Sequence, residues 1–85
     1  MKNVVMYSTD SCSFCVMAKV LLRRRGIEFT EINLSKDPAG RTELAQRTGM
    51  MSFPQILVDD ELVGGFRELL GADRSGRLDE LLALA

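Results

Sequence analysis

Two cysteines separated by two residues, Cys12 and Cys15, are the side chains in this sequence best suited to chemistry. They are the only cysteines among the 85 residues. Side chains three positions apart on the first turn of a helix lie on one face, so the two sulfurs can close a small disulfide. A helix N terminus also stabilises negative charge, which favours a thiolate at Cys12. The pair therefore predicts a redox-active dithiol, with Cys12 as the attacking thiol and Cys15 as the resolving thiol.

Two other uses of the cysteine pair stay open from the residues alone. A structural disulfide would close a very short loop, so it would remove little entropy from the unfolded chain. A zinc ion would need two further ligands, yet the chain has no histidine and no third cysteine. Zinc would therefore require carboxylates or groups from a partner. Redox chemistry is the stronger interpretation of the three.

Length and charge narrow the possible classes of function. The 85 residues predict one domain spanning 1–85, with no room for a second module. A formal net charge of −1 gives no sign of a nucleic-acid or membrane partner. The one basic cluster, 23–25, falls at the expected C-terminal end of a helix, where cations offset the helix dipole. No segment resembles a signal peptide or reaches transmembrane length, so we expect a cytoplasmic protein.

The elements around the cysteines alternate between strand and helix, which predicts an α/β domain built in layers. Residues 3–8 contain an apolar run that predicts a buried strand leading into the cysteine pair. Residues 13–25 are apolar almost all the way round, so we expect a largely buried helix here. Gly26 suits the position just after this helix, where a left-handed backbone often ends the last turn.

A second strand and helix are expected next. Residues 28–33 predict a strand with Phe29 and Ile32 facing the core. The segment 37–49 begins with Asp-Pro, a preferred pair for capping and starting a helix, and it ends with a glycine suited to helix termination. The resulting strand, helix, strand unit should have a right-handed crossover and a parallel strand pair.

The second half of the chain changes character. Residues 55–58 and 61–63 predict two short strands, joined by an aspartate pair into an antiparallel hairpin. Phe66 is expected to open a short helical piece after a double glycine. A last helix is expected from residue 75 or 76 to Ala85, because leucine and alanine recur at helical spacing.

Four features in a fixed order carry a family resemblance. The segments concerned are Val5-Met6-Tyr7 before the cysteine pair, Ala18-Lys19-Val20-Leu21-Leu22 after it, Ser52-Phe53-Pro54-Gln55-Ile56, and Val63-Gly64-Gly65-Phe66. Together they resemble the glutaredoxins of the thioredoxin superfamily over essentially the whole chain. The resemblance implies a thioredoxin-like fold, in which helices flank a small central four-stranded mixed sheet. It also implies thiol–disulfide oxidoreductase activity at the Cys12/Cys15 dithiol.

The resemblance gives a role to the proline before the third strand. Pro54 would have a cis peptide bond and lie across from Cys12, exposing the backbone of Phe53 so that a substrate can pair with it. Taken alone, Pro54 also fits the first position of an ordinary strand.

The resemblance further implies glutathione as co-substrate. Its γ-glutamyl carboxylate would be received at the Gly65 turn by the backbone N–H groups of Phe66 and Arg67, at the start of a short helix. Disulfide-containing client proteins, with ribonucleotide reductase as one candidate, would be the partners of a monomer. Apolar walls for the groove are expected from Phe14, Phe53 and Met51, with core packing as the alternative.

Departures from the family pattern leave two alternatives for the function. Ser13 and Phe14 replace a common proline and tyrosine, Thr9 replaces a common lysine, and Arg67 stands where an acidic residue is frequent. Such changes are compatible with a glutaredoxin-like electron donor that is reduced by thioredoxin reductase and serves ribonucleotide reductase, or with another low-molecular-weight thiol. Because serine between the cysteines tends to permit cluster binding in glutaredoxins, a homodimer could instead hold a [2Fe–2S] cluster through Cys12 and glutathione.

Overall fold

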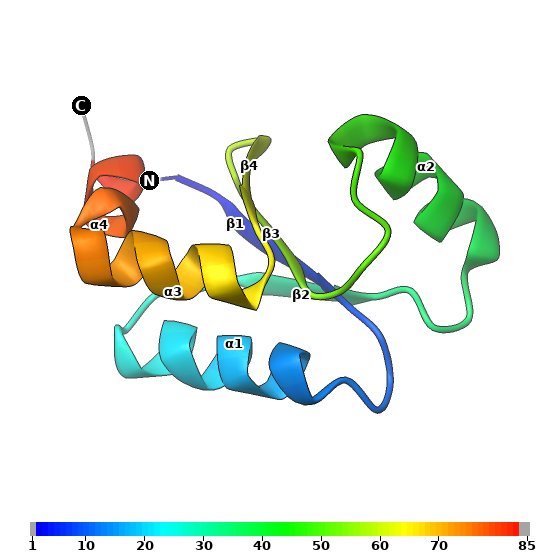
Figure 1. Ribbon diagram of the computed structural model, residues 1–85, viewed down its shortest axis with the longest axis horizontal. Helices are drawn as coiled ribbons and strands as arrows, with labels where there is room; N and C mark the ends of the chain where they lie inside the picture. The colour runs from blue at the N-terminus through cyan, green and yellow to red at the C-terminus, as the bar shows by residue number, and fades with distance from the viewer. Residues whose placement is uncertain (1, 84–85) are drawn as a thin grey trace.

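The computed structural model describes residues 2–83, which form a four-stranded mixed sheet with the order β2-β1-β3-β4 and four helices (Figure 1). β1 (Val4–Ser8) pairs in parallel with β2 (Thr30–Asn33). It pairs antiparallel with β3 (Gln55–Val58), which in turn pairs antiparallel with β4 (Glu61–Gly64). The predicted parallel pair and antiparallel hairpin are both confirmed.

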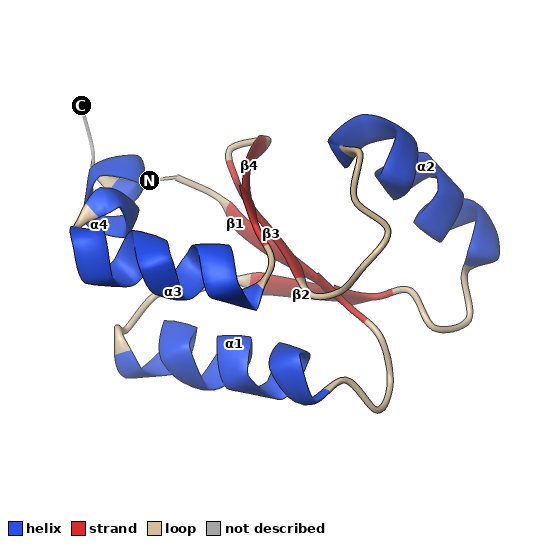
Figure 2. Cartoon of the chain, viewed as in Figure 1, coloured by secondary structure: helices blue, strands red, loops and turns tan. Residues whose placement is uncertain are grey.

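The helices cover both faces of this sheet. They are α1 (Ser13–Arg24), α2 (Pro38–Thr48), α3 (Phe66–Ser75) and α4 (Arg77–Leu82). α1 and α3 lie together on one face, whereas α2 lies on the other (Figures 1 and 2). The helical piece expected at Phe66 is longer than expected, since α3 has ten residues and α4 has six. Ala85, the expected last position of α4, lies outside the described residues.

Local capping rules place the helices where the sequence predicted them. The side chain of Asp37 accepts the backbone N–H of Gly40 at 2.9 Å, and proline occupies the first position of α2. Gly49 ends α2 with a φ of 76°, and Gly26 follows α1 with a φ of 69°. A residue with a side chain is strained in this left-handed region, so glycine suits both positions.

The main core lies between the sheet and the α1/α3 layer. Its fully buried residues come from both of these helices, α4 and the two central strands: Val4, Met6, Cys15, Ala18, Leu22, Ile56, Val58, Leu69, Ala72 and Leu78. On the α2 face, the buried residues are fewer and include Leu44 of α2 itself.

Two burial predictions were wrong. We expected α1 to be largely buried, but only Cys15, Ala18 and Leu22 of this helix are. The sheet and α3 cover one side of the helix, so its other apolar residues face solvent. Ile32 was expected to face the core, yet it is 37% exposed because β2 is an edge strand whose four residues are all exposed. Phe29 precedes β2 and is half-buried against the core.

Candidate active site

Cys12 and Cys15 lie where the chain passes from β1 into α1. Cys12 is the N-cap of α1, and its sulfur accepts the backbone N–H of Cys15 at 3.1 Å. A disulfide joins the two cysteines, whose Cα atoms are 5.1 Å apart. Their exposure differs, because Cys15 is 2% exposed whereas Cys12 is only partly buried. A substrate arriving from solvent therefore reaches the sulfur of Cys12 first.

The loop before β3 faces this disulfide. The Phe53–Pro54 peptide bond is cis, as the resemblance implied. The carbonyl oxygen of Phe53 lies 3.7 Å from the sulfur of Cys12. Pro54 is buried, and Phe53 is half-buried against the core. The backbone of Phe53 is thus next to the accessible sulfur, so a bound substrate would meet both.

A buried glutamine holds this loop in place, and the sequence analysis missed it. Gln55 is 1% exposed. Its side-chain nitrogen donates to the carbonyl oxygens of Met50 (3.1 Å) and Ser52 (3.0 Å), and its side-chain oxygen accepts from the hydroxyl of Thr48 (2.8 Å). Both amide hydrogens are therefore used to hold loop carbonyls. One sequence feature could have indicated its role, because Gln55 is a polar residue at the start of an otherwise apolar strand.

The double glycine brings the start of α3 against the same loop. Gly64 has a φ of 126°, and a Cβ added there would lie 2.8 Å from the side chain of Glu68. A Cβ added at Gly65 would lie 3.4 Å from the carbonyl oxygen of Pro54. The two glycines therefore let the N terminus of α3 pack beside Pro54.

Glu68 caps the N terminus of α3. Its carboxylate accepts the backbone N–H of Gly65 at 2.8 Å. The neighbouring N–H groups of Phe66 and Arg67 are the ones expected to receive an anion. The chain thus places a negative charge of its own beside the expected anion site. This cap was not predicted from the sequence, although a glutamate three residues after an N-cap is a recognisable signal.

The other expected groove residues lie at different depths. The rings of Phe14 and Phe66 stack with centroids 5.9 Å apart and planes at 19°, which joins the cysteine turn to the start of α3. Phe14 is 48% exposed, and Arg67 is also exposed. Met51 is 85% exposed, which excludes core packing as its role. The structure therefore brings the cysteines, Phe14, Phe53, Pro54, Gly65 and Phe66 to one end of the molecule.

A groove of about 480 Å³ opens between α1 and the ends of β1 and β2. Both cysteines line it, together with Lys19 and Glu31. Glu31 accepts from the hydroxyl of Ser8 at 2.7 Å and from Nζ of Lys19 at 3.3 Å. The hydrogen bond from Ser8 lowers the pKa of Glu31 and Lys19 adds to this effect, while partial burial opposes it. An ionised carboxylate therefore borders the disulfide at neutral pH.

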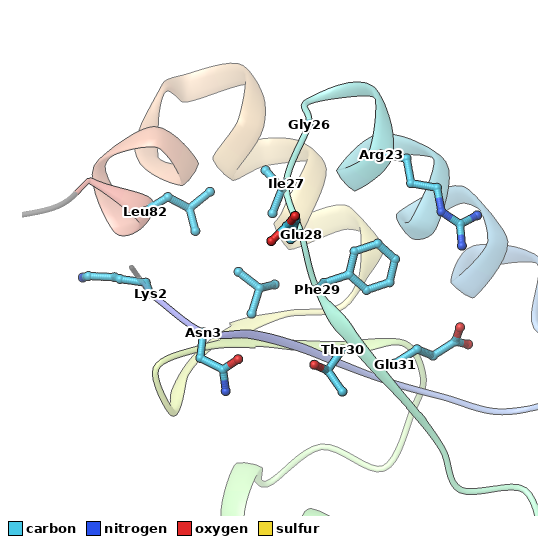
Figure 3. Close-up of a pocket in the computed structure, with 11 residues that line it drawn as sticks. Lys2, Asn3, Arg23, Gly26, Ile27, Glu28, Phe29, Thr30, Glu31 and Leu82 are labelled. Atoms are coloured by element: carbon cyan, nitrogen blue, oxygen red, sulfur yellow. The ribbon is translucent and has the colours of Figure 1, made fainter.

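A larger groove of about 1190 Å³ lies near the C-terminal end of α1 (Figure 3). Ile27, Phe29 and Leu82 supply apolar side chains to it, and Lys2 and Arg23 supply cations. Neither cysteine lines this groove. We therefore assign the redox chemistry to the other end of α1.

The order and geometry of these features match a known protein family. The Glutaredoxin family model matches residues 4–63. The chain belongs to the glutaredoxin family. Among its relatives, a glutaredoxin of Pseudomonas aeruginosa is 42% identical over 83 residues, which cover 98% of this chain and 99% of the relative. Glutaredoxin 3 of Escherichia coli is 38% identical over 82 residues, covering 96% and 99%.

Solved glutaredoxin structures share the fold. The solution structure of the Brucella melitensis glutaredoxin is 40% identical, with a TM-score of 0.83, and covers 98% of this chain and 94% of that one. A buckwheat glutaredoxin, solved as a complex with glutathione, is 25% identical with a TM-score of 0.87, covering 95% and 76%. The predicted thioredoxin-like fold is confirmed. As a glutaredoxin with an intact Cys12–Cys15 pair, the protein is a thiol–disulfide oxidoreductase.

Within 2–83, no three His, Cys, Asp or Glu side chains form a group that could hold a metal ion. No helix in the same range has the length and apolar character required to cross a membrane.

Proposed function

We propose that this glutaredoxin uses glutathione to reduce protein disulfides and glutathione mixed disulfides through Cys12 and Cys15. Family membership establishes thiol–disulfide exchange, so the proposal concerns the reductant, the substrates and the role of each sulfur. The observation that carries it is the asymmetry of the pair. Cys12 is only partly buried and its sulfur lies beside the Phe53 carbonyl, whereas Cys15 is 2% exposed.

Cys12 starts the exchange with a protein disulfide. Its thiolate attacks one client sulfur, forming a mixed disulfide and releasing the other client sulfur as a thiolate. The thiolate of Cys15 then attacks the sulfur of Cys12, which releases the second client sulfur and forms the Cys12–Cys15 disulfide. The client has gained two electrons from the cysteine pair, and solvent supplies the protons taken up by its thiolates.

Glutathione then returns the pair to its reduced state. One glutathione thiolate attacks the sulfur of Cys12 and releases Cys15 as a thiolate. A second glutathione attacks the glutathione sulfur of this mixed disulfide, which frees Cys12 and forms glutathione disulfide. A glutathione mixed disulfide enters at the same intermediate, so its reduction needs Cys12 alone.

We place glutathione between the cysteine turn and the start of α3. The stacked phenylalanine rings, the capped helix start and the cis-proline loop converge there, and the related buckwheat structure is a glutathione complex. All of these residues come from one copy of the chain, so we propose that the protein acts as a monomer. We expect it to act in the cytoplasm, where thiols are kept reduced. The proposed contacts are Phe14, Phe53, Pro54, Gly65, Phe66 and Arg67.

One observation favours a second candidate for the reductant. The Glu68 carboxylate on the N–H of Gly65 would repel a glutathione carboxylate at the neighbouring N–H groups. Reduction by thioredoxin reductase, as in redoxins that serve ribonucleotide reductase, needs no such anion site. This alternative keeps the same chemistry at Cys12 and changes only the source of electrons.

Parallel reduction assays test the proposal. The oxidised protein is supplied with glutathione and glutathione reductase, or with thioredoxin reductase, and NADPH consumption is followed with a small disulfide substrate. We expect rapid turnover with glutathione. Turnover with thioredoxin reductase alone would overturn glutathione dependence.

The Cys15→Ser variant tests the division of roles between the sulfurs. It should lose most reduction of protein disulfides while keeping reduction of a glutathionylated peptide, because only the first reaction needs a resolving thiol. Equal loss of both activities would contradict this division.

A further inference from the structure

The outer side of α1 carries apolar residues that neither the core nor the proposed chemistry uses. We call Val16, Met17, Val20 and Arg24 the outer face of α1, since the helical repeat of about 3.6 residues puts them on one side. Its three apolar residues are 55%, 46% and 41% exposed, in that order. Val16 also lines the groove of about 480 Å³ that both cysteines line. The outer face therefore runs from the disulfide toward the C-terminal end of the helix.

The charge along this helix has one sign. Residues 13–25 include four cationic side chains and no carboxylate, although the whole chain has a net charge of −1. Arg24 has no ion pair or hydrogen bond to another side chain within residues 2–83. Neighbouring residues engage the other three cations, in the pairs Lys19–Glu31, Arg25–Asp73 and Arg23–Phe29, the last of which is visible in Figure 3.

The size and charge of the outer face argue against a second copy of the chain as its occupant. Stable interfaces bury ~800 Å² on each partner, so three partly exposed apolar side chains supply only a small part of the area that a second copy would need. A two-fold contact would also bring two cationic helices together without a carboxylate on either one to pair with Arg24. A small apolar surface that ends in a cation fits a short segment bound transiently.

We infer that the outer face of α1 binds a client segment in which apolar residues separate the reactive cysteine from carboxylates. This inference rests on disulfide exchange at Cys12 and goes beyond the choice of reductant. The client cysteine is held at Cys12, its following apolar side chains pack on Met17 and Val20, and its carboxylates meet Arg24. Recognition of this kind separates protein clients from small disulfides, which are too short to reach the outer face.

The helix geometry sets the spacing in the client. Cys12 and Arg24 are twelve residues apart, which corresponds to about 18 Å along a helix. An extended segment rises about 3.3 Å per residue. It spans that length in about five or six residues, so the carboxylates should stand five or six positions from the client cysteine.

Three synthetic peptides, each prepared as a symmetric disulfide, test this spacing and charge. The first has one cysteine, leucines at the second and fourth positions after it, and glutamates at the fifth and sixth. The second has lysines in place of the glutamates, and the third has the glutamates moved to the first and third positions. The reduced protein is mixed with each disulfide at low salt, and acid quenching with chromatography gives the second-order rate constant. No added reductant is needed, so the outcome is independent of glutathione.

We expect the first peptide to react about fivefold faster than the second and about threefold faster than the third, because exposed charge pairs contribute only modestly to association. Arg24→Glu should reverse the preference between the first two. Arg47→Glu on α2, where Arg47 pairs with Asp60 at 3.5 Å, is the control for net charge and should leave this preference unchanged. Met17→Ser with Val20→Ser should slow the first peptide, while hydroxyethyl disulfide reacts at an unchanged rate in every variant.

Three results would overturn the inference. Equal rates for the glutamate and lysine peptides would show that Arg24 contacts no client charge. The same change from Arg47→Glu as from Arg24→Glu would show a general effect of net charge. Sedimentation of the unmodified protein as a dimer that Arg24→Glu dissociates would show that a second copy covers the outer face.

A slow reaction of hydroxyethyl disulfide with the unmodified protein would instead indicate failure of the exchange chemistry itself.

Discussion

α1 and α2 have nearly the same length and lie on opposite faces of one sheet (Figure 2). They nevertheless present different side chains to solvent. α1 exposes Phe14, Val16, Met17 and Val20 by 41% to 55%. α2 buries Leu44 and exposes mainly polar side chains. Packing against the sheet explains why the inner side of each helix is apolar. It does not require apolar residues on the outer side. The apolar surface is therefore concentrated on the helix that carries the disulfide.

The two helices also contribute differently to the core. Leu22 of α1 belongs to the main cluster of buried residues, while Leu44 of α2 lies outside it. The α2 face instead contains Gln55, whose hydrogen bonds hold the loop opposite the cysteines. α1 therefore contributes both core residues and the reactive cysteines. The α2 face contributes the hydrogen bonds that hold the loop opposite those cysteines.

The strongest test of this division is removal of the attacking thiol. Cys12→Ser should lower disulfide turnover by at least ~10³-fold, because a hydroxyl cannot replace the thiolate as nucleophile. Gln46→Ser, an exposed substitution on α2, should leave turnover unchanged. Steady-state rates of the two variants measure the contrast, and substantial activity in Cys12→Ser would refute the assignment.

Matched leucine truncations compare the packing of the two helices. Leu22→Ala should lower the free energy of unfolding by about 4 kcal/mol, and Leu44→Ala by about 2–3 kcal/mol, since both leave cavities but the main core surrounds only Leu22. Urea denaturation gives both values. A larger loss at Leu44 would mean that the α2 face contributes more to stability than its burial suggests.

Loss of the buried amide tests the support given by the α2 face. Gln55→Leu should lower the free energy of unfolding by about 2 kcal/mol, because the Met50 and Ser52 carbonyl oxygens lose their donor. It should also slow exchange at Cys12 by displacing the Phe53 backbone. Gln46→Leu on the surface of α2 serves as the control. Unchanged activity in a folded Gln55→Leu protein would show that the loop is held by other contacts.

The smallest expected effect is electrostatic and lies beside α1. The pKa of Glu31 is lowered in the folded state, chiefly by the Ser8 hydrogen bond. The resulting stabilisation is present above the unfolded-state pKa near 4.5 and is lost as the pH falls through the folded-state pKa. Glu31→Gln should therefore lower the free energy of unfolding by about 1 kcal/mol at pH 7 and by little at pH ~2.5. The effect is small because Glu31 and its partner Lys19 are partly exposed to solvent.

Denaturation of the unmodified protein and Glu31→Gln at the two pH values measures this difference. Glu43→Gln on α2 is the matched control, because no side chain of the described residues hydrogen-bonds to that exposed carboxylate. A cost of Glu31→Gln that is the same at both pH values would rule out the electrostatic origin.

Features that depend on neighbouring residues in the chain could be predicted from the sequence. The start of α2 follows from Asp37 and Pro38, and its end follows from Gly49, because capping involves only the adjacent turn. The disulfide between Cys12 and Cys15 follows from their spacing in the same way. The ordered motifs added the fold and the cis bond at Pro54 through the family resemblance.

Apart from the local Glu68 cap at Gly65, the features that were missed depend on distant parts of the chain. The apolar pattern of residues 13–25 indicates a helix with few polar positions. It does not indicate that only one side of this helix packs against the sheet and α3. Ile32 was misplaced because nothing in residues 28–33 reveals that β2 is an edge strand. Gln55 was passed over because its partners lie in a preceding loop whose path is known only from the fold.

The charge on α1 also affects how partners arrive. Residues 13–25 have a charge of +4, so the remainder of the chain carries −5. This separation makes α1 the positive element of the molecule, with three of its four cations at the C-terminal end, away from the disulfide. At physiological ionic strength the field is screened over about 8 Å, so it acts mainly during final approach. Encounter with an acidic protein should therefore slow as salt is added, while encounter with a neutral small disulfide should not.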